Sequence, residues 1–285
     1  MKERSVKYPW INPIGGLGDA LMLSGILKKV YDKNPGIKYN LVRRNKYTSI
    51  LDGHPAIAAI GHPPKDAEII KTDYWSMEKL GGEEQRAYQI LARYFGLKTP
   101  VKEDLYLPGH NNNDKLLHDF IPWKEKNIIL SPSSESPRKE IPPGFWHQVV
   151  EKLLEMHINV LQVGKKEELH IKNTFSLMGL TDPHQLVELI KKADLVATVD
   201  NFIMHIAHMV GTPAVVLWGP TSPEVYGYPE HIHIKASLDH CPMQDQCLGP
   251  GLAQNYRTPC PIHEQHCMNN ISYDTVYKNI INILI

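Results

Sequence analysis

At 285 residues, the chain is long enough for two α/β halves or one large domain. Its 31 basic and 31 acidic side chains balance, which argues against an overall basic field that would recruit nucleic acid or an acidic membrane. No apolar run reaches the roughly eighteen residues of a membrane span, and residues 1–8 lack an apolar signal core, so we expect a cytoplasmic protein without a transmembrane segment.

The first half of the chain alternates short apolar runs with helical patterns. The predicted strands are residues 8–12, 38–42, 56–60 and 67–70, and the predicted helices are residues 19–31, 46–51 and 83–94. Such alternation is typical of a parallel sheet with helices on both faces. Residues 107–123 contain Pro, Gly and an Asn tract, so we interpret them as the linker between a first domain, 1–118, and a second, 119–285.

The second half repeats the alternation. Its predicted strands are residues 127–130, 158–163, 195–199 and 214–218, and its predicted helices are residues 144–156, 183–192, 202–210 and 273–284. Each strand is nearly all apolar, as a sheet covered on both faces requires. The predicted fold class is therefore α/β, with parallel sheets in both halves.

A glycine-rich turn, Gly15-Gly16-Leu17-Gly18-Asp19, joins the first predicted strand to the first helix. Backbone N–H groups and the positive end of a helix face a ligand at such a turn. Asp19 would repel a phosphate there, but its carboxylate suits a general base that deprotonates a hydroxyl group. Asp19 is equally suited to capping the helix, and the sequence leaves both roles open.

The same glycines suggest a dinucleotide-binding turn, but two further positions disagree with it. That fingerprint needs a third glycine where this chain has Leu21. It also needs an acidic residue at the end of the second strand, where this chain has Arg43-Arg44. We therefore do not expect a dehydrogenase.

Polar residues follow the strands of the second half. In open parallel sheets, ligands bind beyond the carboxyl ends of the strands. The residues found there are Ser133, Ser134, Arg138, Lys139, Glu168, Asp200, Asn201, His205, Gly219 and Thr221. Hydroxyl groups, two cations and a helix N-terminus together indicate an anion site. We expect this half to hold a donor with a phosphate leaving group, and the first half to deprotonate an acceptor.

Several of these residues have a purely structural alternative. Lys139 would then be a solvated loop cation, Asp200 a helix cap, and His205 a core histidine. Their shared position at one edge of the sheet favours a site.

Several ordered motifs resemble those of glycosyltransferase family 9, the ADP-heptose:lipopolysaccharide heptosyltransferase group. The motifs are Gly16-Leu17-Gly18-Asp19-Ala20-Leu21, residues 40–44, residues 51–55, Lys139-Glu140-Ile141-Pro142, Val199-Asp200-Asn201-Phe202-Ile203-Met204-His205 and Leu217-Trp218-Gly219-Pro220-Thr221. The resemblance runs from about residue 8 to residue 276, with a shortened first domain. It implies a GT-B fold, in which two Rossmann-like domains face each other across a cleft and the last helix often returns to the first domain.

The resemblance also implies inverting transfer of a sugar from a nucleotide diphosphate, with an ADP-sugar favoured and no metal required for the chemistry. Asp19 would be the general base, Lys139 would bind the donor phosphates and Glu168 the nucleoside. Asp200 would contact the sugar, and His205 would lie near the phosphates. The remaining predicted donor-binding residues are Gly18, Ser133, Ser134, Arg138, Asn201, Phe202, Gly219 and Thr221.

The chain departs from the family pattern at two of these motifs. The family's Thr-Gly after the aspartate is Asn201-Phe202 here, and its Trp is Ile141. Glycine lets the backbone approach a phosphate closely, whereas Phe202 adds bulk but keeps its N–H group.

The four cysteines, Cys241, Cys247, Cys260 and Cys267, all lie in one stretch near the C-terminus. Grouped thiolates can bind zinc or iron, although the two-residue spacing of a strong zinc signature is absent. The alternatives are buried free thiols or a redox-sensitive pair. The resemblance adds that some family members bind iron through four cysteines. A metal here would be structural, and we expect it to be remote from the chemistry.

The predicted function is that of a cytoplasmic inverting glycosyltransferase. The acceptor is a glycan, a lipid-linked molecule or a protein, and peripheral association with a membrane stays open. Two alternatives remain. One is a catalytically silent sugar-nucleotide-binding protein, which Phe202 favours; the other is a nucleotide-sugar epimerase on the same fold.

Overall fold

The computed structural model describes residues 8–42, 46–72, 86–109, 120–237, 241, 247, 256–260 and 267–285. The chain divides into two compact units, Met1–His110 and Asn111–Ile285, and each is described by itself. The domain boundary that we predicted between residues 118 and 119 lies outside the described residues, as does most of the predicted linker.

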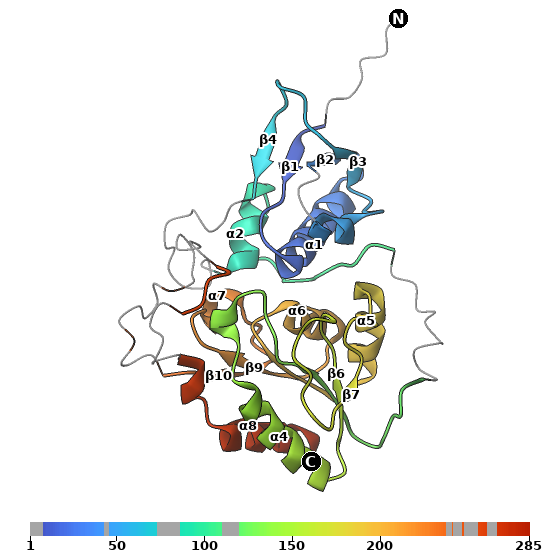
Figure 1. Ribbon diagram of the computed structural model, residues 1–285. Coiled ribbons are helices and arrows are strands. Elements are labelled where there is room, and N and C mark those ends of the chain that lie inside the picture. The colour runs from blue at the N-terminus through green and yellow to red at the C-terminus, as the bar shows by residue number, and fades with distance from the viewer. Residues whose placement is uncertain are drawn as a thin grey trace, which may run out of the picture. The chain divides into compact units, whose positions relative to one another are not determined.

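The first unit is built on a four-stranded parallel sheet in the order β3-β2-β1-β4 (Figure 1). The strands are β1 (Trp10–Asn12), β2 (Tyr39–Val42), β3 (Ile57–Gly61) and β4 (Ile69–Lys71). Its helices are α1 (Leu17–Lys33), the 3-10 helix η1 (Lys46–Leu51) and α2 (Ala87–Tyr94). Because α1 buries Leu21, Ile26 and Leu27 completely, it anchors the core of this unit.

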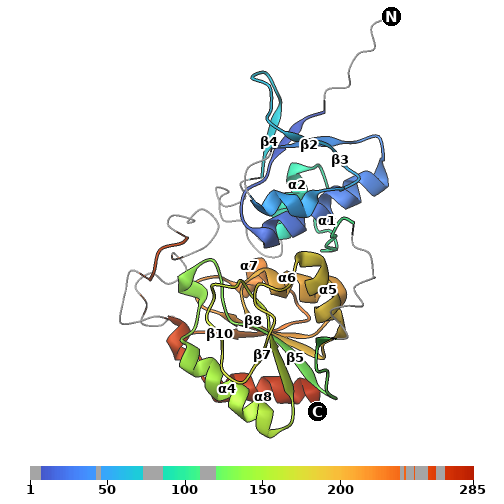
Figure 2. The same cartoon turned by 45° about the vertical axis from the view of Figure 1, so that its right-hand side comes forward.

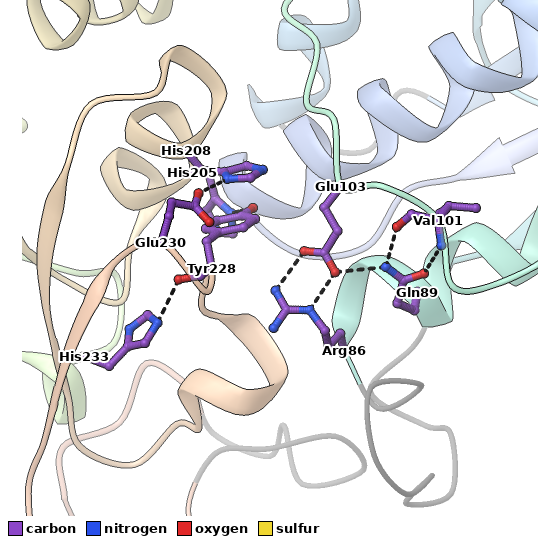
Figure 3. Close-up of polar contacts among 9 residues, drawn as sticks. All are labelled: Arg86, Gln89, Val101, Glu103, His205, His208, Tyr228, Glu230 and His233. Carbon is purple, nitrogen blue, oxygen red and sulfur yellow. Dashed lines mark hydrogen bonds and ion pairs between the residues drawn. The ribbon is translucent and has the colours of Figure 1, made fainter.

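Segment 101–105 packs on α1 and α2 through specific polar contacts. Arg86 makes two hydrogen bonds to the carboxylate of Glu103, at 2.6 and 2.9 Å, and Gln89 bonds both backbone groups of Val101 at 2.8 Å (Figure 3). Gly25 of α1 lies against the backbone of Asp104, so closely that a Cβ atom there would be 2.1 Å from its carbonyl oxygen. A glycine is therefore required inside this helix for packing rather than for flexibility.

The second unit is built on a six-stranded parallel sheet in the order β10-β9-β8-β5-β6-β7. The strands are β5 (Asn127–Ser131), β6 (Asn159–Gln162), β7 (Phe175–Ser176), β8 (Leu195–Val199), β9 (Ala214–Trp218) and β10 (Ile232–Lys235). The helices are α4 (Pro143–Glu155), α5 (Pro183–Lys192), α6 (Phe202–Val210), α7 (Pro223–Tyr226) and α8 (Tyr273–Leu284), with 3-10 helices η4 (Pro137–Lys139) and η6 (Cys267–Asn270). Figures 1 and 2 show α4 and α8 covering one face of the sheet, with α5 and α6 on the other.

The central strands of this sheet are buried along their whole length. All five residues of β5, β8 and β9 are buried, because helices cover both faces. Trp146 of α4 and Val276 and Ile280 of α8 belong to the cluster that fills one face. The last helix, α8, packs against α4, β8 and β9.

The predicted alternation of strands and helices is confirmed in both units. Helix α5 begins where the sequence indicates, since Asp182 accepts hydrogen bonds from the N–H groups of His184 and Gln185 at 2.8 and 2.9 Å. Five short elements of the described residues, β7, β10, α7, η4 and η6, have two to four residues each and were not predicted. They are too short to show a periodic pattern.

Candidate active site

The carboxyl ends of β5, β8 and β9 bring distant parts of the chain to one edge of the second unit's sheet. These strands are neighbours and run parallel, so the residues that follow them share that edge. Lys139 follows β5 by way of η4, Asp200 follows β8 directly, and Thr221 follows β9 after Gly219-Pro220.

Lys139, Asp200 and Thr221 form a buried polar cluster at this edge. The ammonium group of Lys139 donates to Oδ2 of Asp200 at 2.7 Å, and the hydroxyl of Thr221 donates to the same oxygen at 2.7 Å. All three residues are buried, with exposures of 6 % or less. Burial of Lys139 rules out the alternative in which it is a solvated loop cation.

The two charges stabilise each other inside the protein. Burial alone would lower the pKa of Lys139, but Asp200 and the side chain of Tyr256 outweigh it and hold that pKa above its usual value. Burial would likewise raise the pKa of Asp200, yet Lys139 and the Thr221 hydroxyl hold it below the usual range. The cluster therefore keeps a fully charged lysine out of water.

Tyr256 is a residue that the sequence analysis did not identify. The Nζ atom of Lys139 lies 5.2 Å from the centre of the Tyr256 ring, a cation–π arrangement. The two residues are far apart in the chain and belong to no shared motif, so no sequence signal pointed to this contact.

Asn201 caps helix α6 and ties it to the loop after β5. Its Oδ1 accepts from the N–H of Ile203 at 2.9 Å, and its Nδ2 donates to Ser131 Oγ at 3.0 Å and to the carbonyl of Ser133 at 2.9 Å. The cap needs a short polar side chain, and Asn supplies it where the family pattern has Thr. Phe202, half-buried, then occupies the first helical position.

His205 lies one turn into α6 and is also buried. Its Nδ1 atom is 2.6 Å from the hydroxyl of Tyr228, and burial lowers its pKa to about 4. The charges of Asp200 and Lys139 also act on that pKa, which places His205 in the same electrostatic environment. Figure 3 shows His205 with Tyr228 and the neighbouring His208, Glu230 and His233.

Glu168 lies beside the loop that follows β5. Its carboxylate approaches Gly164, where a Cβ atom would be 2.3 Å from Oε2. Burial and the nearby Glu140 raise its pKa, while Lys165 and Ser133 act in the opposite direction. Ser134 is joined to this group, since its N–H donates to Oε1 of Glu140 at 2.9 Å.

The contacts of Arg138 differ from those of the neighbouring Lys139. Its guanidinium group donates to the hydroxyl of Thr258 at 2.7 Å, to the carbonyl of Thr258 at 3.0 Å, and to the carbonyl and sulfur of Cys247 at 3.4 Å. Arg138 therefore binds the cysteine-bearing segment. The described residues of that segment lie close to Lys139, which is nearer to the predicted site than we expected.

The four thiols lie close enough to affect one another electrostatically. Burial, with a smaller contribution from the other three cysteines, raises the pKa of Cys267 to about 11. Four thiols suit zinc or iron chemically, but among the described residues no three His, Cys, Asp or Glu side chains are arranged to hold a metal ion. Gly219 gives this region room, because a Cβ atom there would be 2.4 Å from Met268 Sδ and 2.9 Å from Cys267 Sγ.

In the first unit, Asp19 occupies the first turn of α1, next to Gly18. Its Oδ2 atom accepts from the N–H of Gly16 at 2.7 Å, so it caps the helix. Gly15 has a φ of +101°, and a Cβ there would come within 2.2 Å of Oδ2 of Asp19. The turn therefore holds the carboxylate tightly at the end of β1.

Comparison with known proteins gives a family-level match. The model of glycosyltransferase family 9 (heptosyltransferase) matches residues 83–248. The lipopolysaccharide core heptosyltransferase OpsX of Haemophilus influenzae is 28% identical over 148 residues, which are 48% of this chain and 42% of that protein. The alignment thus spans less than half of that relative.

Solved structures share the fold over nearly the whole chain. The ADP-heptose heptosyltransferase II of E. coli has a TM-score of 0.66 at 15% identity, covering 97% of this chain and 98% of that one. TibC from enterotoxigenic E. coli, an iron-containing dodecameric heptosyltransferase solved with ADP-D-beta-D-heptose, has a TM-score of 0.71 at 13% identity, covering 98% and 76%. The chain has two parallel sheets, of four and six strands, which match those of GT-B heptosyltransferase structures.

No helix within the described residues is both long enough and apolar enough to cross a membrane.

Proposed function

Because the chain belongs to glycosyltransferase family 9, we propose that it transfers a heptose or related sugar from an ADP-linked donor to an acceptor hydroxyl, with inversion at the sugar. The observation that carries this proposal is the buried Lys139–Asp200–Thr221 cluster at the carboxyl ends of β5, β8 and β9. A charged lysine kept out of water at that edge suits an anionic ligand.

In this proposal, the second unit holds the leaving group. The ammonium group of Lys139 and the N-terminus of α6 stabilise negative charge on the departing diphosphate. In the unliganded chain, Asp200 balances the lysine, and on donor binding its carboxylate contacts the sugar. Losing one such donor of positive charge typically costs about 3–4 kcal/mol of transition-state stabilisation.

Glu168 is the proposed ligand of the nucleoside. A carboxylate accepts hydrogen bonds from ribose hydroxyl groups, and Glu168 lies beside Ser133, next to the loop that leads to Lys139. Arg138 has a supporting role, because it holds the segment that places Tyr256 against Lys139.

Asp19 is the proposed general base that deprotonates the acceptor hydroxyl. Its bond to the N–H of Gly16 orients the carboxylate at the end of β1. Substitution Asp19→Asn keeps an oxygen for the cap but removes the base, so transfer should be lost while ADP binding remains. Asp182→Asn, at the cap of α5, is the matched control. If Asp19→Asn retains turnover, Asp19 serves as a cap alone.

The first experiment compares thermal stabilisation of the protein by ADP, UDP, GDP, CMP and NAD. A nucleotide at about one hundred times its dissociation constant adds about 2.7 kcal/mol of stability. Selective stabilisation by ADP, lost in Lys139→Met, is the expected result. A preference for UDP or GDP would contradict the ADP-sugar donor. No response to any nucleotide would contradict the whole proposal.

A transfer assay distinguishes the remaining alternatives. Release of ADP from ADP-heptose that depends on an added glycan, lipid-linked or protein acceptor identifies a transferase and its acceptor class. Conversion of the donor without any acceptor would instead indicate an epimerase. Binding without any turnover would indicate a silent sugar-nucleotide-binding protein.

The cysteine-bearing segment is a proposed site for a structural zinc or iron ion. The support for this site is that the neighbouring cysteines raise the pKa values of Cys247 and Cys267. A bound cation would stabilise the thiolates and offset that repulsion. Metal analysis of the purified protein should give about one equivalent per chain, and Cys267→Ser should lower it. Metal-free protein with unchanged folding would contradict this proposal.

A further inference from the structure

Tyr228 has no role in the sequence motifs or in the proposed reaction, yet its hydroxyl contacts a predicted site residue. The tyrosine is 1 % exposed and lies between α7 and β10. Its hydroxyl is 2.6 Å from Nδ1 of His205. This contact joins two residues that are 23 positions apart in the chain.

The backbone of Tyr228 is held by two histidines. Its carbonyl accepts from the N–H of His231 at 3.0 Å. It also accepts from Nε2 of His233 at 2.9 Å, as Figure 3 shows. The other ring nitrogen of His233 accepts from the indole N–H of Trp218 at 3.0 Å. Gly227 allows this approach, since a Cβ atom there would be 2.7 Å from Cε1 of His233.

The ring of Tyr228 is fixed as well as its backbone. It stacks on the ring of His208, with centres 3.7 Å apart and planes within 4° of parallel. The carboxylate of Glu230 contacts Nδ1 of His208 and so holds the His208 ring in place. The hydroxyl of Tyr228 therefore has one position relative to α6.

A neutral imidazole carries one N–H donor and one acceptor nitrogen. Burial lowers the pKa of His205 to about 4, so its ring is neutral near pH 7. The hydroxyl of a buried tyrosine donates its hydrogen where an acceptor is in reach, and Nδ1 of His205 is in reach. With Nδ1 as the acceptor, the ring proton belongs on Nε2.

We propose that Tyr228 is a positioning residue that fixes His205 as the Nε2–H tautomer, so that the neutral ring donates a hydrogen bond to an oxygen of the sugar-nucleotide donor. The ligand in this inference rests on the proposed function, whereas the tautomer does not. The opposite tautomer would direct a lone pair toward the donor oxygens and repel them.

The test of the tautomer is nitrogen NMR on protein labelled with ¹⁵N-histidine. The His205 signals are assigned by their loss in His205→Gln. Long-range ¹H–¹⁵N spectra should show His205 protonated on Nε2, and Tyr228→Phe should change this pattern while keeping the stacked ring. Tyr226→Phe, two residues away, should leave the pattern unchanged. Protonation of His205 on Nδ1 in the unsubstituted protein would overturn the proposal.

A second measurement tests the consequence for binding. Titration calorimetry should show that Tyr228→Phe weakens ADP binding by about tenfold to a hundredfold, as expected for one bond to a charged oxygen. The double variant His205→Gln with Tyr228→Phe should bind ADP only slightly more weakly than Tyr228→Phe alone. Both changes remove the same hydrogen bond from His205 to the nucleotide. Unchanged ADP affinity in Tyr228→Phe would overturn the proposal. If the unsubstituted protein binds no ADP, the proposed function fails, and the NMR result still decides the tautomer.

Discussion

At the scale of single residues, the chain keeps the charged pair of Lys139 and Asp200 buried. Replacing a buried ion pair by apolar side chains is often neutral or stabilising. The pair of Lys139 and Asp200 is therefore poorly explained by stability alone. A site that must present a charge to a ligand explains it better.

Removing one partner of this pair should be costly. Lys139→Met leaves the Asp200 carboxylate buried without its counter-charge, so we expect the free energy of unfolding to fall by about 3–5 kcal/mol. The double variant Lys139→Met with Asp200→Asn should recover part of this loss, since no charge remains buried. Urea unfolding of both proteins measures the difference. A double variant no more stable than the single one would show that the unpaired charge is not the cause.

His54 makes the stability of the first unit depend on pH. Its Nδ1 accepts from the N–H of Ala56 at 3.1 Å, its Nε2 lies 3.0 Å from the carbonyl of Ser24, and burial lowers its pKa from 6.5 to about 4. Between these two values only the unfolded chain binds the proton, so stability falls as pH falls, by up to about 1.4 kcal/mol per pH unit.

The matched comparison for this effect is a pair of histidine variants. Unfolding at pH 7, 6 and 5 should show a smaller pH slope in His54→Gln than in the unsubstituted protein. The exposed His62, changed to Gln, should leave the slope as it was. Equal slopes in all three proteins would contradict the prediction.

At the scale of elements, helix α1 is shaped by what packs on it. Ser24 and Gly25 are buried in the middle of the helix, and segment 101–105 lies against Gly25. The absence of a side chain at Gly25 allows the backbones to approach, at some cost in helix propensity.

Two glycine-to-alanine substitutions distinguish the effect of close packing on stability from the effect of helix propensity. In Gly25→Ala, the added Cβ would collide with backbone that cannot move freely, so we expect a loss of about 1–3 kcal/mol in stability. Gly144 in α4 has nothing within 4 Å of the added atom, so Gly144→Ala should be neutral or stabilise by up to about 1 kcal/mol. Thermal unfolding compares them. A harmless Gly25→Ala would show that segment 101–105 can shift.

At the scale of the whole molecule, the two units have separate sheets and separate cores. The proposed donor ligands, apart from Gly18, belong to the second unit, whereas the proposed base belongs to the first. Donor binding and proton transfer are thus assigned to different units. A bound donor should therefore stabilise the second unit more than the first.

Hydrogen exchange of the full chain measures this inequality. With saturating ADP, we expect added protection at the start of α6 and around Lys139, because a bound ligand suppresses local opening there. Strands β1 to β3 should change little. Protection confined to the first unit would contradict the assignment of the donor to the second.

The sequence by itself determined the order of strands and helices, the parallel sheets and the edge at which the polar residues gather. Apolar runs and helical periodicity are local signals, and parallel strands bring their carboxyl ends together whatever the side chains are. Lys139 and Asp200 could therefore be predicted to lie at the same edge of the sheet before their distance was known.

Only the tertiary structure decided which side chains pair. Three contacts join residues that are far apart in the chain. They are Tyr228 with His205, Tyr256 with Lys139, and Arg138 with Cys247. Such contacts depend on loop paths and on the packing of individual side chains. A contact of this kind leaves no periodic pattern in the sequence, because it depends on one pair of side chains rather than on a repeating face.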